Sequence, residues 1–314
     1  MDEQWETQSS SRADGASHAQ SVERSPGAGM EKPVVAPQAA DGPACCGQPG
    51  DSNSSGRLAA SYVYAVGRVE ARFPTLSAEK EFAQAAGRAD TTGKTDQQTF
   101  HTVHSKRENR YLVRQLCWVL RIQGLETYLL QPRALADIDL LVDAIHPERR
   151  PNDIDVVIGV RGPLAPPEMC NGLMVPLVAF DQIYSFDCDA LIQAIPRPEA
   201  ALAERFDPAA RELFNRIMQL TDNAGASDEH RALNYLAMRY PAIYWKTAEQ
   251  FARDFSLSRV EVRPSALSST RRIVDAIFSY TNRNTDFTEK FAVRVDIGEE
   301  FPFLVTKLSP YFDF

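Results

Sequence analysis

One apolar run constrains the fold more than any other feature of this 314-residue chain. Residues 154–160 read IDVVIGV, so that a single carboxylate interrupts an otherwise apolar segment. A run that is almost continuously apolar is typical of a β-strand buried on both faces. We therefore expect residues 154–160 to form a central strand.

The segments around this run alternate between the strand and helix periodicities. Pro176 lies within the second apolar run and predicts an edge strand or a bulge there. The strand patterns lie at 60–67, 126–130, 173–180, 261–263 and 291–297. The helix patterns lie at 76–81, 109–119, 137–145, 211–220, 229–240, 242–255 and 270–280. These patterns predict a mixed α/β (α+β) domain over residues 59–314. Its first half, 59–196, is expected to be strand-rich and its second half, 197–314, helix-rich, which gives a possible subdivision.

Residues 1–58 differ in composition from the rest of the chain. They hold seven of the sixteen glycines and five of the twenty prolines, and Trp5 is their only aromatic residue. A segment of this kind buries too little apolar surface to offset its chain entropy, so a disordered tail is predicted. The adjacent Cys45 and Cys46 are expected to be a flexible exposed pair.

Charge and cysteine content indicate which classes of function are excluded and in which cellular compartment the protein is expected. The net charge of −8 argues against binding nucleic acid. No apolar stretch approaches the roughly 20 residues of a membrane span, and no signal-peptide pattern is present. The five cysteines are few and odd in number, and Cys117 and Cys170 have apolar neighbours. We therefore expect a reduced, cytoplasmic protein without a disulfide framework and without membrane contact.

Two sets of residues could carry chemistry, and each also has a structural interpretation. His101 and His104, with Cys117, Cys170 and Cys188, could complete a zinc site, although their spacing matches no zinc motif. Carboxylates near strand ends could hold a cation or act as acid and base, but helix caps and strand ends also favour Asp. These carboxylates are Asp153, Asp155, Asp181, Asp187 and Asp189. No phosphate-binding loop or nucleophile motif is present, so no cofactor is expected.

Eight separated runs, in order, carry a resemblance to a known family. They are YVYAVG at 62–67, NRYLVRQLCWVL at 109–120, GLETYLLQPR at 124–133, DIDVVIGVRGP at 153–163, PPEMCNGLMVP at 166–176, FDQIYSF at 180–186, DEHRALNY at 228–235 and EFPFLVTKLSP at 300–310. Together they resemble the C-terminal domain of the PatG-type cyanobactin maturation proteases, which PatA-type proteases also carry. The resemblance extends over roughly residues 61–314. The family's domain has no assigned reaction, so the resemblance implies a pathway, the maturation of ribosomally made peptides, and no catalytic residues.

No protease motifs precede the domain, which predicts a non-catalytic accessory protein that binds a precursor peptide or docks a maturation protease. The proline-rich segment 163–174 is the expected contact surface, with a partner surface of Arg161, Glu168, Met169, Leu173 and Met174. A metal-assisted enzyme that uses the histidines and carboxylates, and a structural module that forms a homodimer, are the alternatives.

Overall fold

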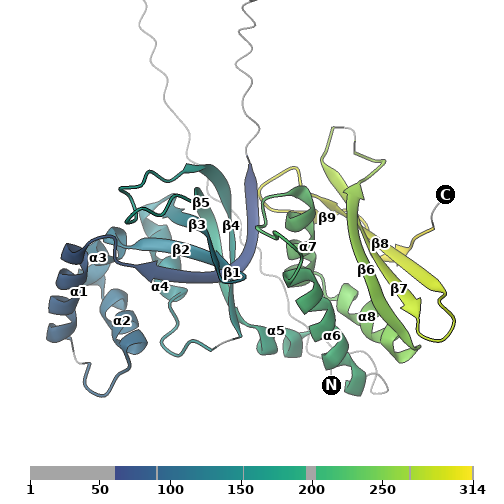
Figure 1. The fold of residues 1–314 in the computed structure, drawn as a ribbon, viewed down its shortest axis with the longest axis horizontal. Helices are drawn as coiled ribbons and strands as arrows, with labels where there is room; N and C mark the ends of the chain where they lie inside the picture. Colours follow the sequence, from purple (N-terminus) through teal and green to yellow (C-terminus); the bar gives the residue numbers. More distant parts are fainter. Residues whose placement is uncertain (1–60, 90, 151, 196–202, 269, 313–314) are drawn as a thin grey trace, which may run out of the picture. The chain divides into compact units, whose positions relative to one another are not determined.

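Two β-sheets organise residues 61–312, which the computed structural model describes without residues 90, 151, 196–202 and 269 (Figure 1). The first sheet is a closed barrel in the order β1-β2-β3-β5-β4. Its strands are β1 (Tyr62–Arg72), β2 (Cys117–Ile122), β3 (Leu125–Pro132), β4 (Asp153–Leu164) and β5 (Pro176–Asp187). All neighbours in it are antiparallel except β3 and β5. The predicted tail 1–58, with Cys45 and Cys46, lies outside the described residues.

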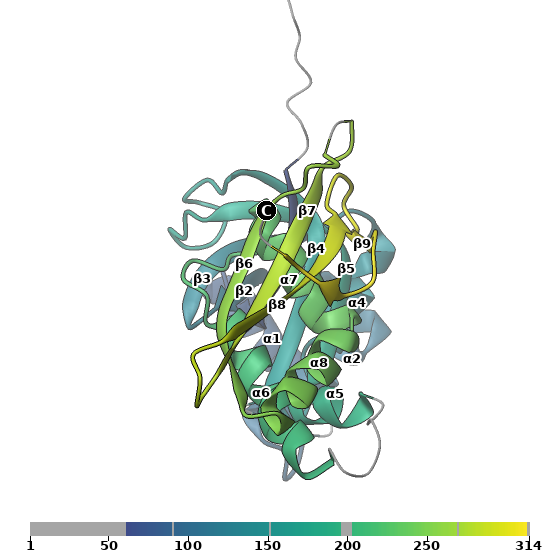
Figure 2. The ribbon, with the colours of Figure 1, turned by 90° about the vertical axis from the view of Figure 1, so that its right-hand side faces the viewer.

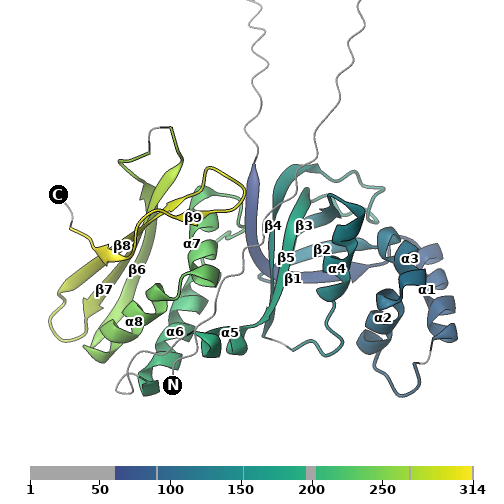
Figure 3. The ribbon, with the colours of Figure 1, turned by 180° about the vertical axis from the view of Figure 1, so that it is seen from behind.

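Short helices follow the barrel strands β1, β3 and β5 in the chain. They are α1 (Leu76–Arg88), α2 (Asp96–Ser105), α3 (Arg110–Gln115), α4 (Ile138–Asp143) and α5 (Cys188–Ala194), with 3₁₀ turns η1 (Arg107–Asn109) and η2 (Leu135–Asp137). Side-chain caps fix several of these helix starts. Thr95 and Gln98 form a reciprocal capping box at α2, and Asp187 accepts hydrogen bonds from the first backbone N–H groups of α5. Figure 3 shows α4 against β5.

The second sheet has the order β10-β8-β7-β6, and β9 pairs with β8 (Figure 2). Its strands are β6 (Phe255–Pro264), β7 (Ile273–Asn282), β8 (Thr288–Asp296), β9 (Phe303–Leu304) and β10 (Ser309–Pro310). Three helices precede it: α6 (Ala203–Met218), α7 (Asp228–Arg239) and α8 (Ala242–Ala252). The mixed α/β class is therefore confirmed.

Strand β4 is buried on both faces, as the apolar run predicts. Val157 points into the barrel core with Trp118 and Phe180. Val156 and Ile158 point the other way and join the apolar core formed with α6, α7 and the second sheet. The outer face of the barrel and the helical layer thus share one continuous core.

Gly225, just before α7, joins these two regions. Its φ of +69° lies in the left-handed region, and a Cβ atom there would lie 2.3 Å from the carbonyl oxygen of Tyr64. The Gly225 carbonyl accepts a hydrogen bond from the Tyr64 N–H at 2.9 Å, and Asn234 Nδ2 donates to the Tyr64 carbonyl at 2.9 Å. Only glycine combines this backbone conformation with so close an approach.

Two local predictions are corrected by the structure, and a third is decided between its alternatives. Residues 270–280 are not a helix, because β7 occupies Ile273–Asn282. The helix expected over 109–119 ends at Gln115, and Cys117 already begins β2. Of the two alternatives for Pro176, the bulge is the one that the structure shows: Pro176 is the first residue of β5, a strand paired on both sides, and lies opposite an irregularity in the register of β4.

Candidate functional site

The loop 165–175, between β4 and β5, is anchored to the outside of the barrel. Cys170 forms a disulfide with Cys117 at the start of β2, across 53 residues of sequence and a Cα–Cα distance of 5.8 Å. The expectation that these two cysteines are reduced is therefore wrong. Their apolar surroundings were read correctly but did not reveal the bond, because burial is common to free and to paired cysteines.

Apolar packing and turns fix the same loop. Ala165 and Cys170 are buried against Val119 and Leu129, and the Ala165 N–H donates to the Val175 carbonyl at 2.9 Å. Further along the loop, N–H groups donate to carbonyls three to five residues earlier: Met169 to Pro166, Gly172 to Pro167 and Leu173 to Cys170. The backbone of the loop is therefore fixed, and its exposed side chains project from this fixed backbone.

The predicted partner surface divides between exposed and packed positions. Arg161, at the exposed end of β4, and Glu168 face solvent. Met169 and Met174 are 38% and 56% exposed. Leu173 is instead half-buried and packs into the cluster beneath the loop.

A cavity of about 280 Å³ lies beside Met169. One wall is the start of β2 with Leu116, and the opposite wall is the end of β3 with Leu130. Apolar side chains from η2 and α4 close it further. No local sequence pattern indicated this cavity, because the segments that line it lie far apart in the chain. The full lining is Val113, Arg114, Gln115, Leu116, Cys117, Trp118, Leu129, Leu130, Gln131, Pro132, Leu135, Ile138, Leu141 and Met169.

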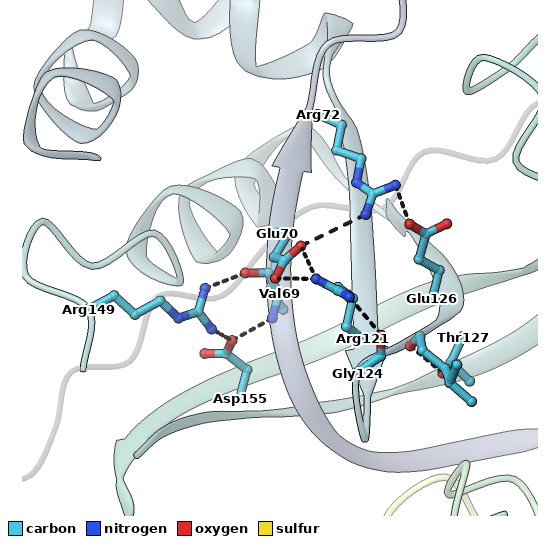
Figure 4. Close-up of polar contacts among 10 residues, drawn as sticks. Val69, Glu70, Arg72, Arg121, Gly124, Glu126, Thr127, Arg149 and Asp155 are labelled. Atoms are coloured by element: carbon cyan, nitrogen blue, oxygen red, sulfur yellow. Dashed lines mark hydrogen bonds and ion pairs between the residues drawn. The ribbon is translucent and has the colours of Figure 1, made fainter. Parts of the chain in front are cut away.

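A second cavity, of about 410 Å³, lies between the β2–β3 turn and α6. Two of its polar side chains, Arg121 and Gln123, are already engaged. Arg121 donates to Glu70 at 3.3 Å and to the Gly124 carbonyl at 2.7 Å (Figure 4). Gln123 donates to the carbonyls of Met218 and Leu220. These contacts make Arg121 and Gln123 less available to a ligand in this cavity.

Asp155, the carboxylate within the central apolar run, is a structural group. It is fully buried and accepts hydrogen bonds from the Val69 N–H and Ser185 Oγ, each at 2.6 Å. Arg149 pairs with it at 2.5 Å and also donates to the Val69 carbonyl (Figure 4). The carboxylate thus joins β1, β4 and β5 and leaves no oxygen for a substrate or cation.

The remaining acidic candidates also have structural partners. Asp153 accepts from the Arg150 N–H, and Asp181 pairs with Arg133. Asp187 caps α5, and the backbone N–H groups of Ala190 and Asp189, with Arg150, lower the pKa of its carboxyl. Asp189 pairs with Arg211 at 2.5 Å. These carboxylates are not assembled into an acid–base pair.

The hypothetical zinc ligands are not brought together either. Cys117 and Cys170 are bonded to each other. His104 is fully buried, its Nδ1 lies 2.7 Å from the Phe100 carbonyl, and it stacks on Phe82. Burial lowers the pKa of His104 to about 4. Among the described residues, no three His, Cys, Asp or Glu side chains are grouped as metal ligands.

Comparison with known proteins identifies a related family for part of the chain. Residues 201–311 match the family described as PatG C-terminal. A solved structure described as a PatG domain of unknown function matches with a TM-score of 0.63 and 18% sequence identity. That match covers 80% of this chain and 98% of the other, so it extends well beyond residues 201–311. Comparison with curated proteins found no match.

The chain resembles the PatG C-terminal domain, as the eight sequence runs indicated. At 18% identity the structural match establishes a shared fold, and a shared fold does not specify an activity. In the described ranges, none of the helices is both long and apolar enough to cross a bilayer.

Proposed function

We propose that this protein is a non-catalytic accessory component of a pathway that matures ribosomally made peptides, such as a cyanobactin pathway, and that it binds the precursor peptide. The resemblance to the PatG C-terminal domain supports the pathway. The loop 165–175 supports the binding role, because it holds exposed apolar side chains on a fixed backbone.

The observation that carries this proposal is the exposure of Met169 and Met174 on a disulfide-anchored loop. Exposed methionines adapt their shape to varied apolar partners. A backbone that is already ordered lowers the conformational entropy lost on binding. Arg161 and Glu168 are exposed and carry opposite charges, so contacts with them would select among peptides rather than add much affinity.

The metal-assisted enzyme has no comparable support. Asp155 and Asp187 are used in structural contacts, and two of the suggested cysteine ligands are bonded to each other. Docking of a maturation protease would use the same exposed loop, so a peptide titration and a protease titration separate these two partners.

Calorimetric titration of the full chain with a synthetic cyanobactin precursor peptide tests the proposal. We expect micromolar binding and no peptide hydrolysis by mass spectrometry. Replacing Glu168 and Met169 together by alanine should weaken binding at least fivefold. Leu125→Ala, at an exposed position on β3 that is in the lining of neither cavity described above, is the matched control and should leave affinity unchanged. Cleavage of the peptide, or the absence of any binding, would overturn the accessory role.

A further inference from the structure

The pairing of β2 with β3 stops before either strand ends. The ladder runs from Ile122↔Leu125 to Val119↔Leu129 and goes no further. Residues 117–118 of β2 and 130–132 of β3 continue beyond it as strand. Their other edges remain paired: Cys117 lies opposite Arg72 of β1, and Leu130 lies opposite Val178 of β5.

The barrel therefore contains a slot between two strand segments that face each other without pairing. In an antiparallel strand, successive residues direct their N–H and C=O groups alternately toward the two neighbours. Part of the backbone at 116–118 and 130–132 thus faces the slot. Buried backbone groups normally have a partner, and one left unpaired costs free energy.

The cavity of about 280 Å³ described above occupies this slot. Its side walls are apolar: Leu135 and Ile138 lie on one side and Met169 on the other. Gln131 Nε2 donates to Met169 Sδ at 3.8 Å, which holds the methionine beside the slot. Free strand edges combined with apolar side pockets are the features by which proteins bind peptides through added strands.

Arg114 is the one charged side chain in this lining. It lies exposed near the end of α3, and no hydrogen bond or ion pair within the described ranges engages it. Arg110, on the same helix, is in contrast paired with Asp139 at 2.7 Å. A partner that fills the apolar slot would therefore gain by placing a carboxylate at Arg114.

We propose that the slot between β2 and β3 binds a short extended peptide segment in which an acidic residue alternates with apolar ones. The segment pairs its backbone with the free edge of β2 or β3, inserts an apolar side chain between Leu135 and Met169, and places its carboxylate at Arg114. This inference rests on the proposed function and specifies how the peptide is bound. It extends the contact surface from the outer loop to the barrel itself.

The test uses the full chain and a blocked heptapeptide, acetyl-Thr-Val-Asp-Val-Asp-Val-Thr-amide. Two further peptides serve as probes, one with lysine in place of both aspartates and one with N-methyl groups on alternate backbone nitrogens. We expect micromolar binding of the first peptide, at least tenfold weaker binding of the lysine peptide, and none of the N-methylated peptide. Hydrogen exchange should show new protection at 116–118 or 130–132.

Arg114→Gln should weaken binding of the aspartate peptide about tenfold and remove the preference over the lysine peptide. Arg107→Gln, an exposed arginine of η1 outside the cavity, is the matched control and should change nothing. Equal binding of the N-methylated peptide would overturn strand addition, although peptide binding as such would stand. Binding of the precursor peptide without binding of the heptapeptide would overturn the slot and leave the proposed function intact. If neither peptide binds, both proposals fail.

Discussion

Buried aspartates in the barrel and in the second sheet differ in how exposed their arginine partners are. In the barrel, Asp155 is fully buried and the side chain of its partner Arg149 is only 12% exposed. In the second sheet, Asp275 and Asp296 are also buried, but their partners Arg294 and Arg271 are 39% and 52% exposed. Water can replace a lost partner in the second sheet and cannot easily do so in the barrel. The Asp155–Arg149 pair of the barrel is therefore more sensitive to the loss of one partner than the two pairs of the second sheet.

The two regions also differ in whether their sequences match the PatG C-terminal family. The PatG C-terminal family match covers residues 201–311, which form the helical layer and second sheet. The disulfide-anchored loop and the slot both lie in the barrel, before those residues. The region with the clearer family signal is thus not the region that holds the candidate site.

The largest expected effect is a loss of global stability, and it tests whether the region after the barrel can fold without the barrel. Val157→Asp places a carboxylate in the barrel core, where it costs several kcal/mol against a total stability of about 5–15. Because β4 belongs to both cores, we expect the whole chain to lose its cooperative thermal transition. Leu125→Asp, at an exposed position, should melt normally. Native-like hydrogen-exchange protection of 203–310 in Val157→Asp would show that the second region folds alone.

A smaller effect is expected when single ion pairs are broken, and it compares the Asp155–Arg149 pair with the Asp275–Arg294 pair. Asp155→Asn leaves Arg149 without its carboxylate in a buried site, and should cost about 3–5 kcal/mol in urea unfolding. Asp275→Asn, whose arginine partner reaches water, should cost about 1 kcal/mol or less. Replacing Asp155 and Arg149 together by leucine and methionine should recover only part of the first loss, because the Val69 N–H and Ser185 Oγ would still lack their acceptor. Equal losses at Asp155 and Asp275 would remove the distinction between the regions.

The smallest effect concerns pH. Burial lowers the pKa of His104 from 6.5 to about 4, so between these values the unfolded chain binds a proton that the native chain does not. Stability should therefore fall by up to about 3 kcal/mol as the pH drops from 6.5 to 4. His104→Leu should lose less stability over this window. His230→Gln, at a half-buried histidine of the second region, should follow the parent curve more closely. Parallel curves for the parent and His104→Leu would show that His104 has the same pKa in the native and unfolded chains.

Local patterns predicted the elements whose environment is simple. The run at 154–160 has apolar residues on both faces because both faces meet a core, and it forms β4 as expected. The patterns at 229–240 and 291–297 likewise lie on α7 and β8. Residues 270–280 were misread because Ile273, Val274 and Ile277 are spaced as on a helix. Their strand is buried on both faces, so the alternation that marks a half-exposed strand is absent.

The candidate site was only partly accessible from the sequence. Met169 and Met174 were identified from composition and are exposed, whereas the binding role assigned to them stays a prediction. The cavity depends on a β2–β3 ladder that stops at Val119↔Leu129, and no residue pattern marks where pairing ends. The Asp155–Arg149 pair and the Cys117–Cys170 bond depend in the same way on contacts that only the folded chain creates.

The enclosure of the slot bears on whether copies of the chain can associate through their strand edges. An unpaired strand edge is a template on which a second sheet can grow, and proteins usually protect such edges. Here the free edges are only a few residues long and lie between the anchored loop on one side and α4 on the other. If the slot binds a peptide as proposed, this enclosure would favour a single strand over the edge of a second sheet. The Cys117–Cys170 disulfide, which anchors this loop, thus helps to keep the short free edges enclosed.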